Sequence, residues 1–197
     1  MSLLRLTANV RRSSALRAVC ACGLLVAALA ATQARADSAA PLAGLVDAAA
    51  QRLQVAEPVA AVKWHTHGLI EDPDRVQQVL ADMRADAAER HLDADYVARV
   101  FGDQIDATEA IEYRRFADWK LTPSSAPADS PDLAASRSAI DGFNQTMLTQ
   151  LAANWDVLHS PQCPAQLDTA RSGVARARHL DGLYQQALTT ATKSYCA

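Results

Sequence analysis

The sequence predicts an all-α protein, and three features of its composition support this fold class. The chain beyond residue 36 is rich in Ala, Leu, Gln, Arg and Glu, which form helices readily. The whole 197-residue chain contains only seven glycines. No stretch shows the alternation of apolar and polar residues, rich in β-branched types, that indicates a strand. We therefore expect a single bundle of helices around one core.

The first 36 residues are expected to be a cleavable export signal. Arginines without any acidic residue precede an apolar run at 18–31, and the small-residue site Ala34-Arg35-Ala36 follows. Signal peptidase reads this order of segments. A membrane anchor is the alternative, but the run is shorter than the roughly 20 apolar residues that span a bilayer. We expect cleavage after Ala36, a domain at 37–197, no remaining membrane anchor, and a secreted or periplasmic location.

The charge of the expected mature chain argues against some partners. Residues 1–36 hold five of the 19 basic residues and none of the 22 acidic ones, so 14 basic and 22 acidic residues remain, a formal charge of −8. Such a surface does not suit nucleic acid or an anionic membrane. An anionic small molecule would need a local cluster of cations.

Two cysteines, Cys163 and Cys196, remain in the expected mature chain. In an oxidising compartment such a pair indicates one disulfide. A catalytic or metal-binding pair is the alternative, but the CxxC spacing typical of such pairs is absent.

The first three helices are placed by caps and prolines. Residues 41–66 are expected to form one helical region, which its internal proline Pro58 would either kink or stop. Asp72-Pro73 is an N-cap followed by proline at the first helical position, which starts a helix over 73–90. The third helix covers 94–120.

The last three helices follow a proline-rich connector at 121–132. Ser130-Pro131 repeats the cap-and-proline pattern and starts a helix over 131–158. Two shorter helices, at 164–178 and 180–195, lie between the cysteines and would be pinned by the disulfide.

Polar residues stand on the faces that should form the core. On the 94–120 helix, Thr108 and Glu112 lie four residues apart in the middle of the apolar arc, so they stack on one face. A carboxylate there is costly unless it is paired or protonated.

Cations border the apolar faces of the other helices. Arg137 and Asn144 fall on the inward stripe of 131–158, and Arg75 borders that of 73–90. Arg52 and Lys63 are eleven residues apart and align if the first helix kinks rather than stops. Scattered salt bridges, or arginines whose heads reach water, are the alternative reading. Taken together, these cations would form a desolvated cluster with excess positive charge, and such a cluster indicates a polyanionic small ligand.

The order and spacing of these residues resemble the active site of the all-helical (AroQ) chorismate mutases. There an Arg is followed by a Lys eleven residues later, then Asp-x-x-Arg, then Ser/Thr and Gln/Glu four apart. The segments VAAVKW, DQIDATEAIEYRRFADWKL, ASRSAID and RHLDGLYQQALTTATKSYC resemble the secreted gamma subclass over essentially the whole mature chain. The matching residues are Arg52, Lys63, Asp72, Arg75, Thr108 and Glu112.

The resemblance implies a six-helix bundle with one disulfide, usually a homodimer, that converts chorismate to prephenate without a metal or cofactor. Arg137 matches the arginine that this subclass supplies within one chain. The sequence departs from the pattern at Val79, where relatives are often polar, and the adjacent Gln78 faces elsewhere on an ideal helix. The implied catalytic residues are Arg52, Lys63, Glu112 and Arg137. The implied substrate contacts are these four with Asp72, Arg75, Val79, Thr108 and Glu109.

Two other readings are open from the residues alone. A secreted helical binding protein would not need Thr108, Glu112 and Arg137 on interior faces. A metal site at His65 and His67 is weaker, because residues two apart on a helix diverge by about 200° and spacing places no third ligand nearby.

Overall fold

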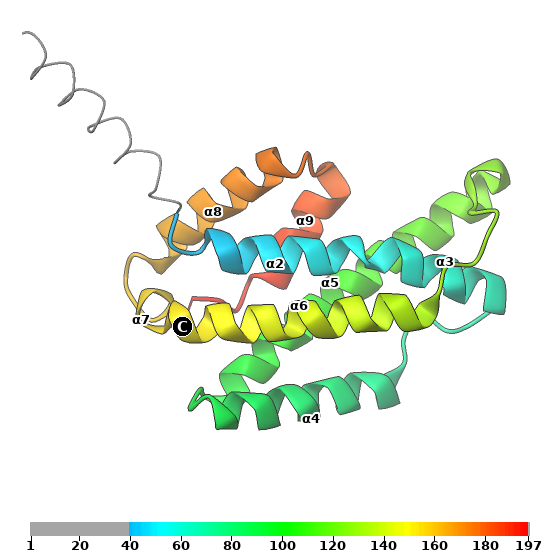
Figure 1. The fold of residues 1–197 in the computed structure, drawn as a ribbon. Coiled ribbons are helices and arrows are strands. Elements are labelled where there is room, and N and C mark those ends of the chain that lie inside the picture. The colour runs from blue at the N-terminus through cyan, green and yellow to red at the C-terminus, as the bar shows by residue number, and fades with distance from the viewer. Residues whose placement is uncertain (1–39, 197) are drawn as a thin grey trace, which may run out of the picture. The chain divides into compact units, whose positions relative to one another are not determined.

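The computed structural model describes residues 40–196, so the expected export signal at 1–36 lies outside the described residues. Every regular element in this part of the chain is a helix, which confirms the predicted all-α class (Figure 1). The elements are α2 (Ala43–Gln54), α3 (Ala56–Thr66), α4 (Pro73–Glu89), α5 (Ala94–Leu121), η1 (Pro123–Ser125), α6 (Leu133–Ala153), α7 (Trp155–Leu158), α8 (Cys163–Ala177) and α9 (Gly182–Ala191).

The expected count of six helices is too low, because two of the predicted stretches are interrupted. Pro58 has no N–H to donate to the Gln54 carbonyl, and α2 ends at Gln54. Val55 keeps helical dihedral angles, so the chain kinks into α3 without stopping. At the C-cap of α6, the Gln150 carbonyl accepts from both the side chain (2.8 Å) and the backbone N–H (3.0 Å) of Asn154.

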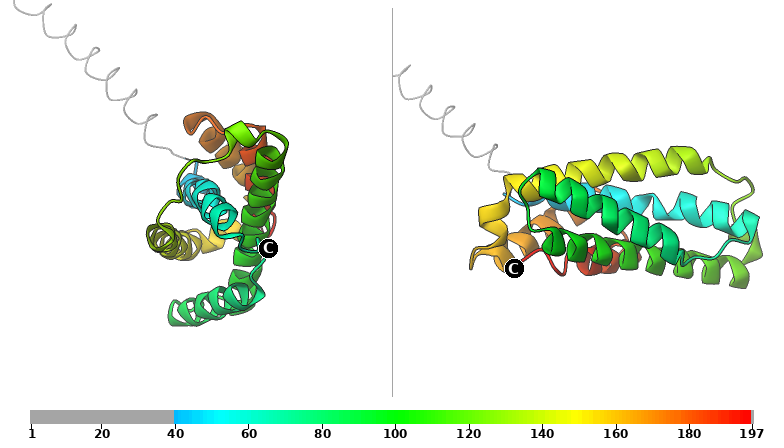
Figure 2. Two further views of the ribbon diagram at one scale, coloured as in Figure 1. Left: turned by 90° about the vertical axis from the view of Figure 1, so that its right-hand side faces the viewer. Right: turned by 90° about the horizontal axis from the view of Figure 1, so that it is seen from below.

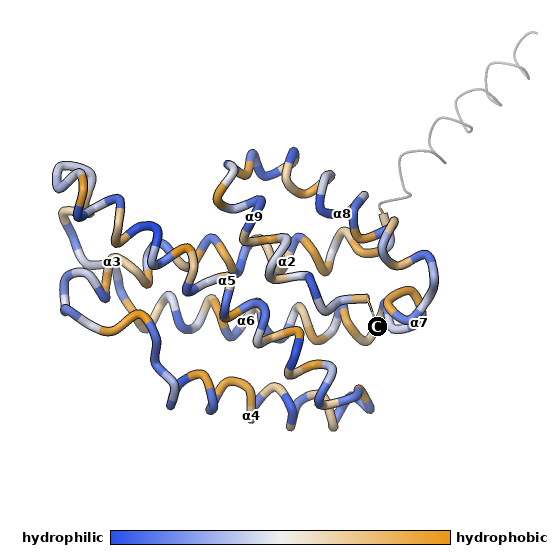
Figure 3. The backbone as a smooth tube through the Cα atoms, turned by 180° about the vertical axis from the view of Figure 1, so that it is seen from behind, coloured by the Kyte–Doolittle hydropathy of each residue, from blue (hydrophilic) through white to orange (hydrophobic). Residues whose placement is uncertain are grey.

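The long helix α5 is the centre of the bundle. It packs against α4, α3 and α9, while α2 packs against α6 and α8. Figure 2 shows α4 at the edge of the bundle. Hydrophilic and hydrophobic residues alternate along α4 and α6 in Figure 3, as expected for helices with one apolar side.

The core is one large cluster of buried apolar side chains from most of these helices. Each fully buried large side chain contributes roughly 1.5–3 kcal/mol relative to an exposed one. A smaller cluster beside it contains Trp64, Phe116 and Trp119, whose rings meet edge to face or tilted. Fully buried members of the large cluster include Leu45, Leu53, Phe101, Ile111, Met147 and Leu188.

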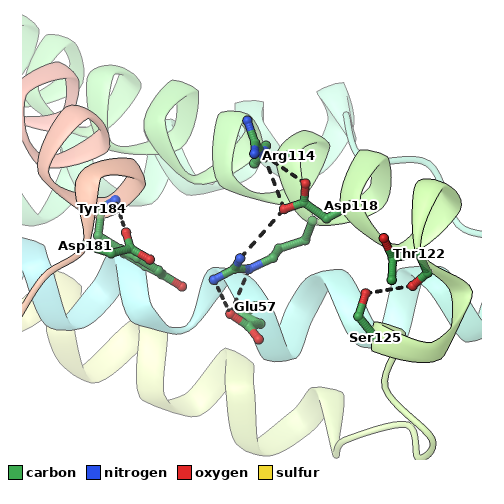
Figure 4. A network of polar contacts seen from close by, with 8 residues as sticks. Glu57, Arg114, Asp118, Thr122, Ser125, Asp181 and Tyr184 are labelled. Atoms are coloured by element: carbon green, nitrogen blue, oxygen red, sulfur yellow. Dashed lines mark hydrogen bonds and ion pairs between the residues drawn. The ribbon is translucent and has the colours of Figure 1, made fainter.

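An ion pair, a disulfide and a hydrogen bond join parts of the bundle that are far apart in the sequence. Arg115 of α5 pairs with Glu57 of α3 at 2.8 Å, within the network of Figure 4. The disulfide predicted between Cys163 and Cys196 is present, with the two Cα atoms 5.6 Å apart. It ties the start of α8 to the chain beyond α9, where Tyr96 also donates to the Tyr195 carbonyl (2.7 Å).

No helix within residues 40–196 is both long enough and apolar enough to cross a membrane.

Candidate active site

A cavity of about 500 Å³ lies among α3, α4, α5 and α6, beneath the loop at 67–72. Arg52, near the end of α2, also reaches it. All the residues expected to contact a substrate line this cavity, namely Arg52, Lys63, Asp72, Arg75, Val79, Thr108, Glu109, Glu112 and Arg137. The structure therefore brings together residues that are up to 85 positions apart in the sequence.

Arg52 is the buried cation of the cavity, with 4% of its surface exposed. Its Nε donates to Asn144 Oδ1 (2.7 Å) and its Nη1 donates to Thr108 Oγ1 (3.3 Å). A guanidinium has five N–H donors, so three remain for a ligand. Burial lowers the pKa of Arg52 from 12.5 to about 10, which leaves the side chain charged at neutral pH.

Lys63 and Glu112 form an ion pair inside the cavity. The Lys63 Nζ lies 2.7 Å from Glu112 Oε2 and donates to the Ile70 carbonyl at 2.6 Å. Glu112 is only 2% exposed. Burial raises the pKa of Glu112 above its ordinary value, although the hydrogen bond and charge of Lys63 oppose this shift. Desolvation thus outweighs the neighbouring cation, a balance that the sequence left open.

Thr108 and Glu109 lie one turn before Glu112 on α5. Thr108 Oγ1 donates to the Gln104 carbonyl (2.8 Å) and accepts from Arg52, which fixes its hydroxyl. Burial raises the pKa of Glu109, and the nearby carboxylates Glu71 and Asp106 raise it further. Both residues face the cavity, as their spacing predicts.

Asp72 and Arg75 stand at the start of α4, where Asp72 is the predicted N-cap. Its Oδ1 accepts from the backbone N–H of Arg75 at 3.1 Å. The side chain of Arg75 is 40% exposed, and its Nη2 lies 3.8 Å from Asp141 Oδ1. Arg75 therefore belongs to the rim of the cavity.

The prediction that Arg137 points into the bundle interior is wrong, since its side chain is exposed. It lines the cavity, but from the solvent side. The first turns of α6 cover a cavity instead of packed core, and Leu133 and Ile140 are only partly buried there. Helical periodicity identifies the face but does not distinguish a cavity from a core.

Val79, where the family resemblance led us to expect a polar residue, is buried and lines the cavity. The neighbouring Gln78 is exposed and donates to Asp82 (2.8 Å). Gln78 thus faces away, as expected, and does not replace a polar group at position 79.

The expected excess of positive charge is not found when every group is ionised. Four cationic side chains line the cavity, but so do four carboxylates, including Glu71, which was not predicted. The lining gains net positive charge once Glu109 or Glu112 is protonated, and burial raises the pKa of both.

Two contacts were not assigned from sequence. The sequence predicts an inward face for Asn144 but no role, and in the structure its side chain accepts a hydrogen bond from Arg52. Its burial on an apolar stripe was the available signal. The Ile70 carbonyl, which accepts from Lys63, comes from a loop whose path no residue pattern reveals.

Within residues 40–196, no group of three or more His, Cys, Asp and Glu side chains is arranged to hold a metal ion. His65 is exposed near the end of α3. His67 is the C-cap of that helix, in the left-handed conformation (φ 54°).

Comparison with known proteins gives a consistent result. The profile of the family "Chorismate mutase type II" matches residues 43–113, a stretch that holds every expected site residue except Arg137. A secreted chorismate mutase of Mycobacterium tuberculosis is 60% identical over 172 residues, covering 87% of this chain and 86% of that protein. A secreted chorismate mutase of Mycolicibacterium smegmatis is 54% identical over 163 residues, covering 83% and 90% respectively.

Solved structures show the same fold. The chorismate mutase of Burkholderia phymatum superposes with a TM-score of 0.76 at 29% identity, covering 80% of this chain and 96% of that one. That of Burkholderia thailandensis gives 0.76 at 32% identity, covering 80% and 100%. With this identity spread over most of both chains, the chain belongs to the chorismate mutase family.

Proposed function

We propose that the cavity is the active site in which the chain converts chorismate to prephenate. The observation that carries this proposal is the convergence of Arg52, Lys63, Arg75 and Arg137 with Glu112 on one cavity. Chorismate is a dianion, so its two carboxylates supply the counter-charge that such cations bind.

The reaction is an intramolecular [3,3] rearrangement, in which one C–O bond breaks as one C–C bond forms. It needs no nucleophile and no net proton transfer. The protein has to hold the reactive conformer and stabilise negative charge that develops on the ether oxygen.

The arginines are assigned to the carboxylates. Arg52 presents three N–H donors that the atoms of residues 40–196 leave unused, and a guanidinium can bind a carboxylate through two of them. Arg75 and Arg137 at the rim would close on the second carboxylate, because their partly exposed side chains can turn toward a ligand.

Lys63 is assigned to the ether oxygen. Two of its three donors are used by Glu112 and the Ile70 carbonyl, and the third is available. Glu112 can assist only by donating, so it acts in its protonated form or shares a proton with the bound substrate. The raised pKa of this carboxyl group favours that form.

We assign the orientation of the chorismate ring to four further residues of the lining, Thr108, Asp72, Glu109 and Val79. The Thr108 hydroxyl donates to Gln104 and accepts from Arg52, so one lone pair remains to accept from the substrate hydroxyl. Asp72 uses one carboxylate oxygen as a helix cap and keeps the other. Val79 supplies an apolar wall and no hydrogen bond.

The proposal is tested by following the loss of chorismate absorbance and the appearance of prephenate with the purified protein. We expect turnover, and Arg52→Ala should raise KM at least about tenfold because a charge-assisted contact is lost. Arg176→Ala, which removes an exposed arginine of α8 outside the cavity, serves as the matched control. Absence of turnover by the wild-type protein would refute the proposed function.

We also propose that residues 1–36 direct export and are removed after Ala36, leaving a 37–197 domain that acts as a homodimer outside the cytoplasm. The similarity to two secreted relatives supports the location. N-terminal sequencing of the exported protein tests the cleavage site, and light scattering of the purified protein tests the dimer.

A further inference from the structure

Arg52 is held from α6 by a residue that has no part in the assignments above. The Nε of Arg52 donates to Asn144 Oδ1 at 2.7 Å, across 92 positions of sequence. Asn144 is 2% exposed, so this contact joins two buried side chains. Removing one partner of such a bond leaves the other unsatisfied.

The contact fixes which edge of the guanidinium is free. The group is planar, with Nε on one side and the two Nη atoms at the end. Asn144 occupies Nε and Thr108 occupies one Nη1 donor, so the remaining donors lie on the Nη atoms. Those donors are the ones left for a carboxylate in the cavity.

The acceptor is neutral, so the pair of Arg52 and Asn144 keeps a net positive charge. An aspartate at the same place would form an ion pair with the guanidinium and compete with a ligand carboxylate. The acid that α6 does carry nearby, Asp141, is exposed and lies 3.8 Å from Arg75 instead. The buried position facing Arg52 thus holds an amide, and the exposed position one turn earlier holds a carboxylate.

We propose that Asn144 is a positioning residue of the chorismate mutase reaction, orienting Arg52 toward a substrate carboxylate without neutralising it. This inference rests on the proposed function of the cavity. It assigns to α6 a buried contribution distinct from that of the exposed Arg137.

The test compares Asn144→Asp and Asn144→Ser with the same substitutions at Asn154, which lies at the end of α6 outside the cavity. Asn144→Asp keeps the shape and the acceptor but adds charge, so we expect KM to rise at least about tenfold while kcat changes less. Asn144→Ser is too short to reach Nε and should lower kcat/KM about tenfold. Both Asn154 variants should stay within about twofold of the wild type.

Melting temperatures separate positioning from packing. If Asn144 only supports the fold, Asn144→Asp would shift the melting temperature and leave KM of the folded protein within twofold of wild type, and that result would overturn the inference. If Asn144→Asp does not fold, the kcat/KM of Asn144→Ser relative to Asn154→Ser decides the question. A wild-type protein without turnover would overturn the proposed function and this inference together, whereas active wild type with unaffected Asn144 variants overturns the inference alone.

Discussion

Glu112 is a carboxyl group held in a cavity wall beside a single lysine, and its protonation state decides what it can contribute. Desolvation raises the pKa of Glu112, and the Lys63 ammonium at 2.7 Å opposes the shift. A carboxyl group placed near an oxygen that gains negative charge stabilises it only when it carries a proton. The environment of this one residue therefore links activity to pH.

The pH dependence follows from the direction of that shift. The donating form of Glu112 is lost as pH rises through its raised pKa, so kcat should fall with increasing pH over that range. In Glu112→Gln the amide donates at every pH, so this limb of the kcat profile should disappear. Glu89→Gln, an exposed change at the end of α4, is the control and should keep the wild-type profile. A limb that persists in Glu112→Gln would assign the ionisation to another group.

For single residues, the sequence predicts which side chains lie on the inner face of a helix. It does not predict the balance of charges in the cavity lining. Thr108 and Glu112 are found on the predicted face because helical spacing determines it. Arg137 is exposed and Glu71 adds a carboxylate to the cavity lining. Both facts depend on how α6 and the 67–72 loop enclose the cavity. Periodicity carries no information on that enclosure.

Among the helices, α4 shows how one residue can serve both the fold and the site. Asp72 caps α4 and also lines the cavity, whereas Asp132 caps α6 through the Ala134 N–H without lining it. The two aspartates are therefore a matched pair of N-caps, of which only Asp72 lines the cavity.

Substituting each cap separates these roles. Asp72→Ala and Asp132→Ala should each lower the free energy of unfolding by about 1 kcal/mol, because each leaves helix N–H groups without a partner. Only Asp72→Ala should also reduce kcat/KM. Urea unfolding and steady-state kinetics on both variants provide the comparison. Equal kinetic effects of the two changes would show that Asp72 acts through helix stability alone.

Helix starts are better predicted than helix interruptions. The cap-and-proline signal places the start of α4 at Pro73, where the structure has it. The same signal at Ser130-Pro131 is two residues early, because Asp132 is the N-cap and α6 begins at Leu133. The break between α6 and α7 at Asn154 is marked by no proline or glycine in the sequence, so it was not predicted. The kink before α3 follows from Pro58, and the chain continues through it as a helix, so Arg52 and Lys63 still reach one cavity.

For the whole molecule, the disulfide closes a loop with a sequence separation of 33 residues. Removing it with Cys163→Ser and Cys196→Ser should lower the free energy of unfolding by about 3–4 kcal/mol on the chain-entropy account. Neither cysteine lines the cavity, so kcat/KM of the folded variant should stay within about twofold of wild type. Urea unfolding with and without reductant gives the measurement, and the double variant should not respond to reductant. A change below about 1 kcal/mol would contradict this assignment.

The bundle as a whole was predictable because caps, prolines and apolar stripes agree on helices. Its assembly around a cavity was predictable only through the family resemblance, since contacts such as Arg52–Asn144 join residues far apart in sequence. In the proposed reaction this assembly delivers cations to a substrate dianion, and one of them, Lys63, reaches the breaking bond.

The role of Lys63 is measured by steady-state kinetics of Lys63→Ala, with Lys120→Ala, a change of an exposed lysine at the end of α5, as the control. We expect kcat to fall roughly 100- to 1000-fold while KM changes much less, because the lost contact is strongest in the transition state. Lys120→Ala should match the wild type. An unchanged kcat in Lys63→Ala would contradict the electrostatic role of this lysine and the mechanism built on it.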